Sequence, residues 1–394
     1  MSETSVAIGR RPGAPTRYGV TRDDLGELLA SEGQPRYRAD QVWRGLYEQL
    51  VGPAAITNLP AALRTRLEAL LPLALEPVTE SVADDGETVK FLSRVAGGYE
   101  VETVLMLYPD RATVCVSSQA GCAMGCGFCA TGQAGFDRHL TTGEIVEQAV
   151  TAAARAKAAG RRLSNVVFMG MGEPLANETA MWPAVERLHG DLGLSARHLT
   201  VSTVGIVPGI RRLTERPLPV TLAVSLHAAN DGLRDELVPI NRRYPIDALL
   251  DACQGYLAAH GRRMSFEWAM IDGVNDRPSD AVELASLCRR LRPAAHVNLI
   301  PLNPTPGWPT TGSPLARVRD FRDHLESLGV QATVRRNRGT DIDAACGQLA
   351  ARHREGQLAA RHREGQLAAR HREGQLAARH REDGSRDQQP AART

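Results

Sequence analysis

The chain has 394 residues, of which 43% are hydrophobic and only 4% aromatic, a composition that predicts one large globular domain with a small accessory domain. No stretch approaches the roughly 20 uncharged apolar residues of a membrane helix, and the N-terminus lacks the apolar core of a secretory signal, so we expect a cytoplasmic protein without membrane contact. The net charge is +2, but residues 347–394 carry ten arginines against six acidic residues. The rest is slightly acidic, which excludes a general basic field as the basis of nucleic-acid binding.

The N-terminal part of the chain is predicted to be helical. After an arm at residues 1–20 that we expect to be flexible, residues 21–80 contain prolines between stretches in which apolar residues recur every three or four positions. One such stretch contains Asp40, Trp43, Leu46, Tyr47 and Leu50. We interpret this part as a small helical accessory domain.

A β extension is predicted at residues 81–111. Residues 87–107 alternate in polarity around Gly97-Gly98, a pattern typical of a β-hairpin. Glu102 lies in the second strand of this hairpin, where a carboxylate is commonly exposed on the surface.

Residues 112–346 alternate between short apolar strands and helical stretches. The expected strands are at 113–118, 165–169, 198–203, 220–226, 264–271, 296–302 and 330–336. Strands that alternate with helices form a parallel sheet with right-handed crossovers. About six such units predict an α/β fold with a partial (β/α)6 barrel rather than a complete barrel. Ligands bind at the C-terminal ends of the strands in such folds.

The C-terminal residues 347–394 form a low-complexity tail. The nonapeptide GQLAARHRE occurs four times between residues 347 and 382. A nine-residue period turns successive leucines to opposite faces of a helix, so no continuous apolar stripe forms. We expect no specific function for this tail.

The segment GCAMGCGFCAT places Cys122, Cys126 and Cys129 in a C-x3-C-x2-C pattern. Three thiolates can each bind one iron of a [4Fe–4S] cluster and leave the fourth iron open to an exogenous ligand. An open iron next to S-adenosylmethionine (SAM) permits electron transfer to the sulfonium, the chemistry of radical-SAM enzymes. The alternatives are a zinc knuckle without its fourth ligand and an electron-transfer cluster completed by a distant cysteine. The preceding strand and Phe128 within the motif favour the radical-SAM interpretation.

Glycine and polar residues after the later strands could hold SAM. The segment FMGMGEP contains Gly172 and Glu173, and the glutamate can accept a hydrogen bond from an α-ammonium group. Each residue of this kind also has a purely structural interpretation as a turn or a loop cap, so the prediction depends on their shared position at strand ends. Hydroxyl, imidazole and amide groups suited to ribose and adenine follow at Ser202, Ser225, His227 and Asn303.

Two further cysteines flank the predicted barrel. Cys115 lies seven residues before the cluster motif, and Cys346 lies in the segment DIDAACGQLA. A buried cysteine is more often a small apolar side chain than a reactive one, so neither position by itself indicates chemistry.

Together these motifs resemble one family, the radical-SAM adenosine C2 methyltransferases that act on 23S ribosomal RNA and tRNA. A sister family methylates C8 of the same ribosomal adenosine and shares most of the motifs. The repeats after residue 349 depart from the family pattern. The resemblance spans roughly residues 20–349 and rests on RADQVWRGLY, VETVLM, RATVCVSSQAGCAMGCGFCATG, GMGEPL, VSTVGIVP, VSLHA, LIPLNP and RGTDIDAACGQLA.

The resemblance implies a reaction that consumes two SAM molecules per turnover. The first would methylate Cys346, and the second would be cleaved to a 5′-deoxyadenosyl radical that removes hydrogen from the S-methyl group. Glu102 would take the ring proton of adenine, and Cys115 would form a disulfide bond with Cys346 and release the methylated base. The family's cluster ligands correspond to Cys122, Cys126 and Cys129, and its SAM contacts to Gly172, Glu173, Ser202, Ser225, Leu226, His227 and Asn303.

The resemblance also implies that residues 21–80 bind 23S rRNA and tRNA. We expect a monomer whose cluster is reduced by an external donor similar to flavodoxin or ferredoxin. Arg335, Arg336 and Arg338 form a local basic cluster that could contact phosphate. The alternatives are C8 methylation of the same adenosine, a non-catalytic iron–sulfur RNA-binding factor, and an activase that installs a glycyl radical on a partner protein.

Overall fold

One large sheet organises the fold. The computed structural model describes residues 15–303, 305 and 308–335, and in this part of the chain ten strands pair in the order β1-β2-β3-β4-β7-β8-β9-β10-β11-β12. Neighbouring strands from β4 to β12 are parallel. These strands are β4 (Ala112–Cys115), β7 (Leu163–Phe168), β8 (Leu199–Thr203), β9 (Thr221–Ser225), β10 (Ser265–Met270), β11 (His296–Pro301) and β12 (Ala332–Val334).

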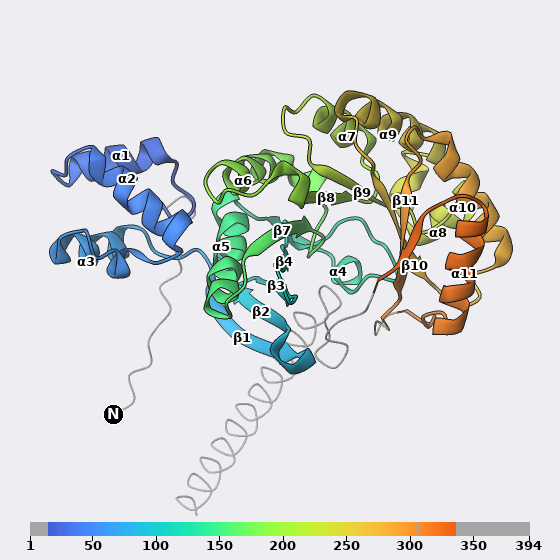
Figure 1. Ribbon diagram of the computed structural model, residues 1–394, viewed down its shortest axis with the longest axis horizontal. Helices are drawn as coiled ribbons and strands as arrows, with labels where there is room; N and C mark the ends of the chain where they lie inside the picture. The colour runs from blue at the N-terminus through green and yellow to red at the C-terminus, as the bar shows by residue number, and fades with distance from the viewer. Residues whose placement is uncertain (1–14, 304, 306–307, 336–394) are drawn as a thin grey trace, which may run out of the picture. The chain divides into compact units, whose positions relative to one another are not determined.

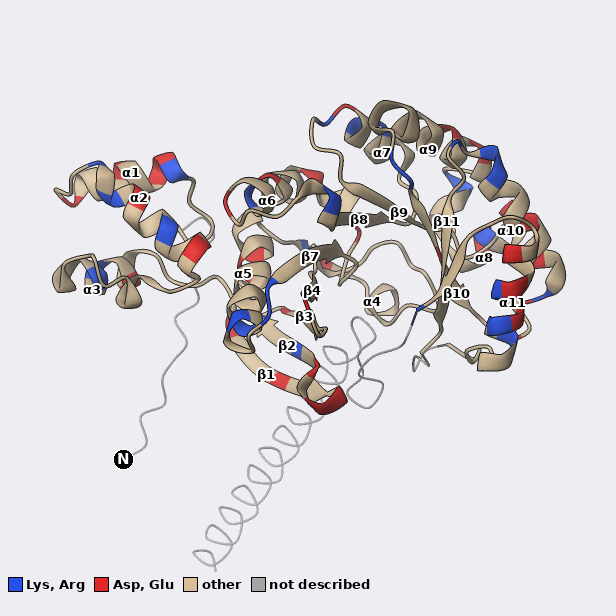
Figure 2. Cartoon of the chain, viewed as in Figure 1, with Lys and Arg blue, Asp and Glu red and all other residues tan. Residues whose placement is uncertain are grey.

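The parallel strands form the predicted partial barrel, and the helices between them lie on its outer side (Figure 1). Because β12 ends the strand order, it does not pair with β4 within the described residues, and the barrel stays open. Charged residues are frequent on the helices, whereas β8 and β9 contain none (Figure 2). The helices are α5 (Thr142–Ala158), α6 (Glu178–Gly190), α7 (Val207–Thr214), α8 (Asp231–Leu237), α9 (Ile246–His260), α10 (Pro278–Arg290) and α11 (Leu315–Ser327).

Strand β10 shows how the sequence separates the core from the barrel interior. Successive side chains of a strand face opposite sides. Phe266 and Trp268 are fully buried, and the Trp268 ring stacks on Phe321 of α11 with ring centroids 6.1 Å apart. Ser265 and Glu267 face the other way and line cavities inside the barrel. An apolar strand with two polar side chains on one face therefore delivers those groups to the interior.

The predicted β extension is present and contains one strand more than expected. The hairpin of β2 (Thr88–Arg94) and β3 (Glu100–Leu107) turns at Gly97 and Gly98, which both have positive φ, and β3 joins the sheet antiparallel to β4. The additional strand β1 (Glu76–Ala83) begins inside the range that we had assigned to the helical domain. The sequence did not predict this strand, because β1 is mostly exposed and its sequence lacks an alternating apolar face.

The N-terminal helices α1 (Arg22–Ser31), α2 (Tyr37–Arg44) and α3 (Ala61–Leu70) confirm the predicted helical segment. Trp43 lies in the expected apolar stripe, and its indole Nε1 donates a 3.0 Å hydrogen bond to Asp191, next to α6. In the described residues no helix is long and apolar enough to cross a membrane. The arm at 1–14, the tail and Cys346 lie outside the described residues. Shorter helical turns are η1 (Gly45–Gln49), η2 (Pro53–Ala55), η3 (Asp84–Gly86), η4 (Pro174–Asn177), η5 (Ala196–His198) and η6 (Pro239–Arg242).

Candidate active site

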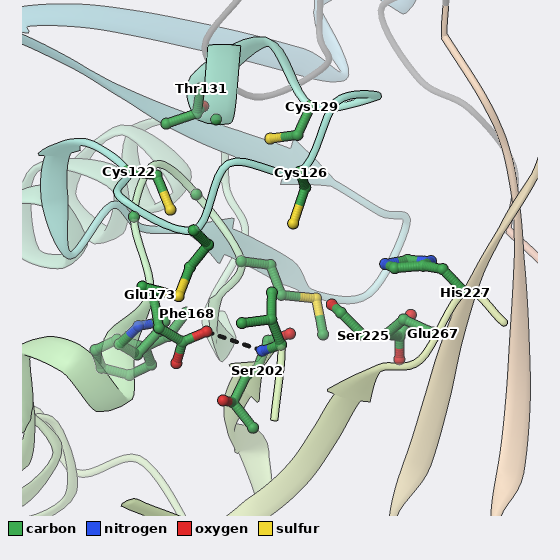
Figure 3. Close-up of a pocket in the computed structure, with 18 of the residues that line it drawn as sticks. Cys122, Cys126, Cys129, Thr131, Phe168, Glu173, Ser202, Ser225, His227 and Glu267 are labelled. Carbon is green, nitrogen blue, oxygen red and sulfur yellow. Dashed lines mark hydrogen bonds between the residues drawn. The ribbon is translucent and has the colours of Figure 1, made fainter. Parts of the chain in front are cut away.

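A cavity of about 220 Å³ lies at the C-terminal ends of the parallel strands. Its wall brings together groups that are far apart in the sequence (Figure 3). The lining includes all three cysteines of the C-x3-C-x2-C motif and five of the predicted SAM contacts, Gly172, Glu173, Ser202, Ser225 and His227. Leu226 and Asn303 are described but are not among the residues that line this cavity.

The three cysteines lie on a short loop between β5 (Gln119–Gly121) and α4 (Ala130–Gln133). The backbone N–H of Cys122 donates to the carbonyl of Gly135 at 2.7 Å, and that of Cys129 donates to the carbonyl of Cys126 at 3.1 Å. These bonds fold the loop back on itself, and the three sulfur atoms face the same space (Figure 3). The strand β6 (Phe136–His139) pairs with β5 and closes the hairpin around the loop.

The chemistry of the three thiols fits an iron–sulfur cluster. Burial raises the pKa of Cys122 to about 12 and also raises the pKa of Cys126, and the charge of Cys129 acts in the same direction. The thiolate forms therefore require positive charge from bound metal, and metal binding displaces the protons. Within the described residues no group of three or more His, Cys, Asp or Glu side chains is placed to hold a single metal ion. In a cubane cluster each of the three thiolates binds its own iron.

Glu173 follows β7 and is almost completely buried. Its two carboxylate oxygens accept hydrogen bonds from the backbone N–H groups of Leu175 (2.9 Å) and Val204 (2.8 Å). Desolvation nevertheless raises the pKa of Glu173 to about 7. Gly172 precedes it with φ +97°, and a Cβ there would lie 2.5 Å from the side chain of Gln119. The glycine of this motif is therefore required by close packing against the strand that leads to the cluster loop.

His227 is held as a neutral ring that can donate into the cavity. Its backbone has φ 60°, and its Nδ1 accepts a hydrogen bond from the N–H of Ala269 at 3.0 Å. Burial lowers the pKa of His227 to about 3, so its single proton lies on Nε2. The ring also packs edge-on against Phe128 of the cluster loop, with centroids 4.8 Å apart.

Arg234 is a buried residue of α8 that the sequence analysis did not identify. Its guanidinium donates to the carbonyl oxygens of Val204 (2.6 Å), Leu226 (3.1 Å) and Ser225 (3.3 Å). Burial lowers the pKa of Arg234 to about 10. These bonds tie together the chain segments that follow β8 and β9, and they explain how Ser225 and His227 are held at the cavity. A lone arginine in a polar helix carries no sequence signal of this role.

Glu102 is buried, so the alternative interpretation of this residue as a surface carboxylate does not apply. Only 2% of its side chain is exposed, and its Oε2 lies 2.8 Å from Nζ of Lys90, which is fully buried. Lys90 and Cys115 both pair with Val104 in the sheet register. Side chains of one face alternate along a strand, so Lys90, Glu102 and Cys115 lie on the same face.

The side chain of Cys115 is buried on this face of the sheet. It packs with Val104, Met106 and Met169, and Met169 also lines the cavity. Met169 therefore connects the cluster that contains Cys115 with the cavity wall. Its predicted disulfide partner Cys346 lies outside the described residues.

The open parallel barrel, the three-cysteine loop and the polar groups at the strand ends define a radical-SAM enzyme. The family model of the radical SAM superfamily matches residues 116–285. The crystal structure of a radical SAM methyltransferase from Sphaerobacter thermophilus is 53% identical in sequence, with a TM-score of 0.81 over 85% of this chain and 98% of that chain.

The curated relatives specify the family. The probable dual-specificity RNA methyltransferase RlmN of Chloroflexus aurantiacus is 51% identical over 348 residues, which cover 85% of this chain and 93% of the relative. The corresponding protein of Frankia alni is 54% identical over 362 residues, 88% of this chain and 86% of the relative. The chain therefore belongs to the RlmN family of radical-SAM RNA methyltransferases. Membership of this superfamily implies a [4Fe–4S] cluster and SAM as the cofactors.

Proposed function

We propose that this chain methylates C2 of adenosine in 23S rRNA and tRNA, with two SAM molecules consumed per turnover. The observation that carries the proposal is the cavity itself, where three thiols of the cluster motif face Glu173 and the polar ends of β8 and β9. Cys122, Cys126 and Cys129 would hold the cluster. The cluster, when bound, supplies the electron that cleaves SAM and takes one electron back from the product radical.

The polar lining is suited to SAM. Glu173 would accept from the α-ammonium group, and the neutral Nε2–H of His227 would donate to an acceptor of the nucleoside. Ser202 and Ser225 offer hydroxyls at the adjacent strand ends. Leu226 and Asn303 do not line the cavity. They would contact the nucleoside through backbone or amide groups that approach it when SAM binds.

Two cysteines would carry the methyl group and release it. The thiolate of Cys346 attacks the methyl of the first SAM, forming an S–CH3 bond and leaving S-adenosylhomocysteine. The radical from the second SAM takes one hydrogen atom from this methyl, and the resulting carbon radical adds to C2 of adenine. After the adduct has lost one electron, Glu102 accepts the ring proton. Cys115 then attacks the sulfur of Cys346, an S–S bond forms as the S–CH2 bond breaks, and the released carbon takes a proton to become the methyl group.

The burial of Lys90 with Glu102 supports this assignment of the base. The ammonium group of Lys90 lies 2.8 Å from the carboxylate and helps to fix its position inside the protein. A carboxylate on the surface would be solvated and would not be aimed at the base. The pair lies on the face of the sheet that carries Cys115, so acid–base and thiol chemistry would act on the same side of the substrate.

The RNA would be held outside the barrel, with the target base splayed out of its stack. The helices α1 to α3 are the proposed RNA-binding segment, and Arg335, which lines the cavity, would meet phosphate together with Arg336 and Arg338, which lie outside the described residues. We propose that the protein acts as a monomer with an external one-electron donor of the flavodoxin or ferredoxin type.

Mass spectrometry of nucleosides from rRNA and tRNA, with and without this gene, tests the function. The expected result is that 2-methyladenosine disappears when the gene is deleted and returns with the wild-type gene but not with Cys126→Ala. The appearance of 8-methyladenosine instead would assign the chain to the C8 reaction. A purified, reconstituted protein that forms no 5′-deoxyadenosine from SAM under reducing conditions would favour a non-catalytic iron–sulfur factor.

A further inference from the structure

Glu267 of β10 carries a buried carboxyl oxygen without a partner. The residue is only 3% exposed, it lines the cavity (Figure 3), and its Oε2 has no hydrogen-bond donor among the described residues. The proposed function does not use this residue. In the sequence it is one acidic position in an apolar strand, with no motif around it.

The other carboxyl oxygen of Glu267 is fully engaged. Its Oε1 accepts hydrogen bonds from Oγ of Ser265 and from Nδ2 of Asn298, both at 2.8 Å. Asn298 is fixed in turn because its Oδ1 accepts from Oγ1 of Thr333 at 2.7 Å. Three neighbouring strands, β10, β11 and β12, therefore hold the carboxyl group in one orientation. The orphan oxygen is positioned and is not free to turn toward solvent.

A buried acceptor without a donor is unfavourable, because water that solvated it in the unfolded chain has been removed. The described residues on both sides of Glu267 supply no donor to Oε2. The strand register places Ser225 opposite Glu267 on β9 and Asn298 opposite it on β11. The amide of Asn298 already donates to Oε1. The missing donor is therefore expected from a ligand. Since Glu267 shares the cavity with Ser225, that ligand has a hydroxyl or amino group at this point.

The order of the strands indicates which part of SAM reaches this point. Glu173, the proposed ammonium contact, follows β7, and Asn303, a proposed contact of the nucleoside, follows β11. In SAM the ribose lies between the amino-acid part and the adenine. The strands between β7 and β11 are β8, β9 and β10, so the ribose hydroxyls fall beside Ser225 and Glu267.

We propose that Oε2 of Glu267 accepts a hydrogen bond from a ribose hydroxyl of SAM, and that Ser265 and Asn298 position it for this contact. The inference rests on the proposed function only in that SAM occupies the cavity. Glu267 is thus a cofactor-binding residue that discriminates a ribose from a deoxyribose. A carboxylate suits this task because it is a strong acceptor with no proton to donate.

Equilibrium binding of S-adenosylhomocysteine to the cluster-loaded protein tests the inference without requiring turnover. Glu267→Gln, which keeps the shape but replaces an acceptor by a donor, is expected to weaken binding by about ten-fold or more, the usual cost of a hydrogen bond to a charged group. Glu326→Gln, an exposed glutamate of α11, is the matched control and should bind as the wild type does. The ligand 2′,3′-dideoxy-S-adenosylhomocysteine completes the experiment: wild type and Glu267→Gln should bind it equally.

Either of two results would overturn the inference. One is wild-type affinity of Glu267→Gln for S-adenosylhomocysteine. The other is a penalty that persists in full with the dideoxy ligand, which would place the contact elsewhere. If Glu267→Gln is unstable on thermal denaturation, Glu267→Asp replaces it, because the shorter side chain withdraws the oxygen while keeping the charge.

The target adenine is the competing source of the donor. If Glu267→Gln binds both nucleoside ligands normally but no longer distinguishes an RNA with adenosine from one with purine riboside at the target position, the exocyclic amino group is the partner and the inference is wrong. Failure of the proposed function has a different signature, because a wild-type protein that shows the ribose effect but leaves RNA unmethylated would refute the function and keep the inference.

Discussion

Two buried glutamates, Glu102 and Glu173, have different kinds of partner. Glu102 has a counter-ion supplied by the protein, the fully buried ammonium of Lys90 at 2.8 Å. Glu173 is bound by the backbone N–H groups of Leu175 and Val204, and the described residues place no basic side chain in an ion pair with it. Burial consequently raises the pKa of Glu173 to about 7.

The difference indicates what each carboxylate is for. Glu102 has a counter-ion within the protein and therefore needs no cationic ligand. A buried carboxylate with only neutral donors lacks a positive charge, and a cationic ligand can supply it. The α-ammonium group of SAM is such a cation. The predictions below test whether the two sites differ in this way.

Removal of the lysine should have the largest effect on stability. Lys90→Met removes the ammonium group that faces the buried Glu102, and breaking such a buried pair should lower the free energy of unfolding by about 3–5 kcal/mol. Chemical denaturation at neutral pH measures this change. Lys90→Met/Glu102→Gln removes both charges and should recover most of the loss. Equal losses in the single and the double variant would show that the lysine acts through packing and not as a counter-ion.

The free energy of unfolding of the apo-protein should depend on pH because Glu173 is buried. Because the folded protein holds this proton more tightly than the unfolded chain, stability is greatest below the unfolded pKa near 4.5 and falls as the pH rises to about 7. The expected contribution is about 3 kcal/mol, from 1.36 kcal/mol per pKa unit. The difference between wild type and Glu173→Ala in denaturant unfolding from pH 4.5 to pH 8 isolates it. A difference that is independent of pH would contradict the raised pKa.

The affinity for a ligand should change less with pH than the stability does. It should rise with pH, whereas the stability falls. S-adenosylhomocysteine keeps the ammonium group but lacks the sulfonium charge, so its affinity should follow the ionised fraction of Glu173. With a pKa of about 7, affinity should rise about ten-fold from pH 6 to pH 8. Isothermal titration across this range measures it, with Lys90→Met as a comparison whose pH profile should match that of the wild type. A flat profile in the wild type would mean that the ammonium group binds elsewhere.

The barrel was predictable from the sequence because its signals are local. Strands such as β9 and β10 are short apolar runs between helices, and a capping box of Thr141 and Glu144 marks the start of α5. The strand β1 was not predictable in this way, since it is stabilised by pairing with β2 along an exposed edge. Sheet register, unlike periodicity, depends on residues that are distant in the chain.

The residues of the candidate site also differ in whether local sequence signals predict them. The cluster cysteines and Glu173 lie in dense motifs, and the sequence identified them. Arg234 and Glu267 act through contacts with three different strands or loops, and no spacing in the sequence expresses such a contact. For Glu102 the hairpin pattern left a surface carboxylate as the alternative, because it does not reveal that β3 is covered on both faces.

The role of Cys115 provides the most direct test of the proposed mechanism. If this thiol only releases the product, Cys115→Ala should allow the carbon radical to add to adenine and then stop, with the RNA joined to Cys346 through a methylene bridge. Denaturing electrophoresis of the reconstituted Cys115→Ala protein with its RNA and SAM should show this covalent complex, and Cys115→Ala/Cys346→Ala should show none. Normal yields of methylated RNA from Cys115→Ala, without a covalent complex, would contradict the two-cysteine mechanism.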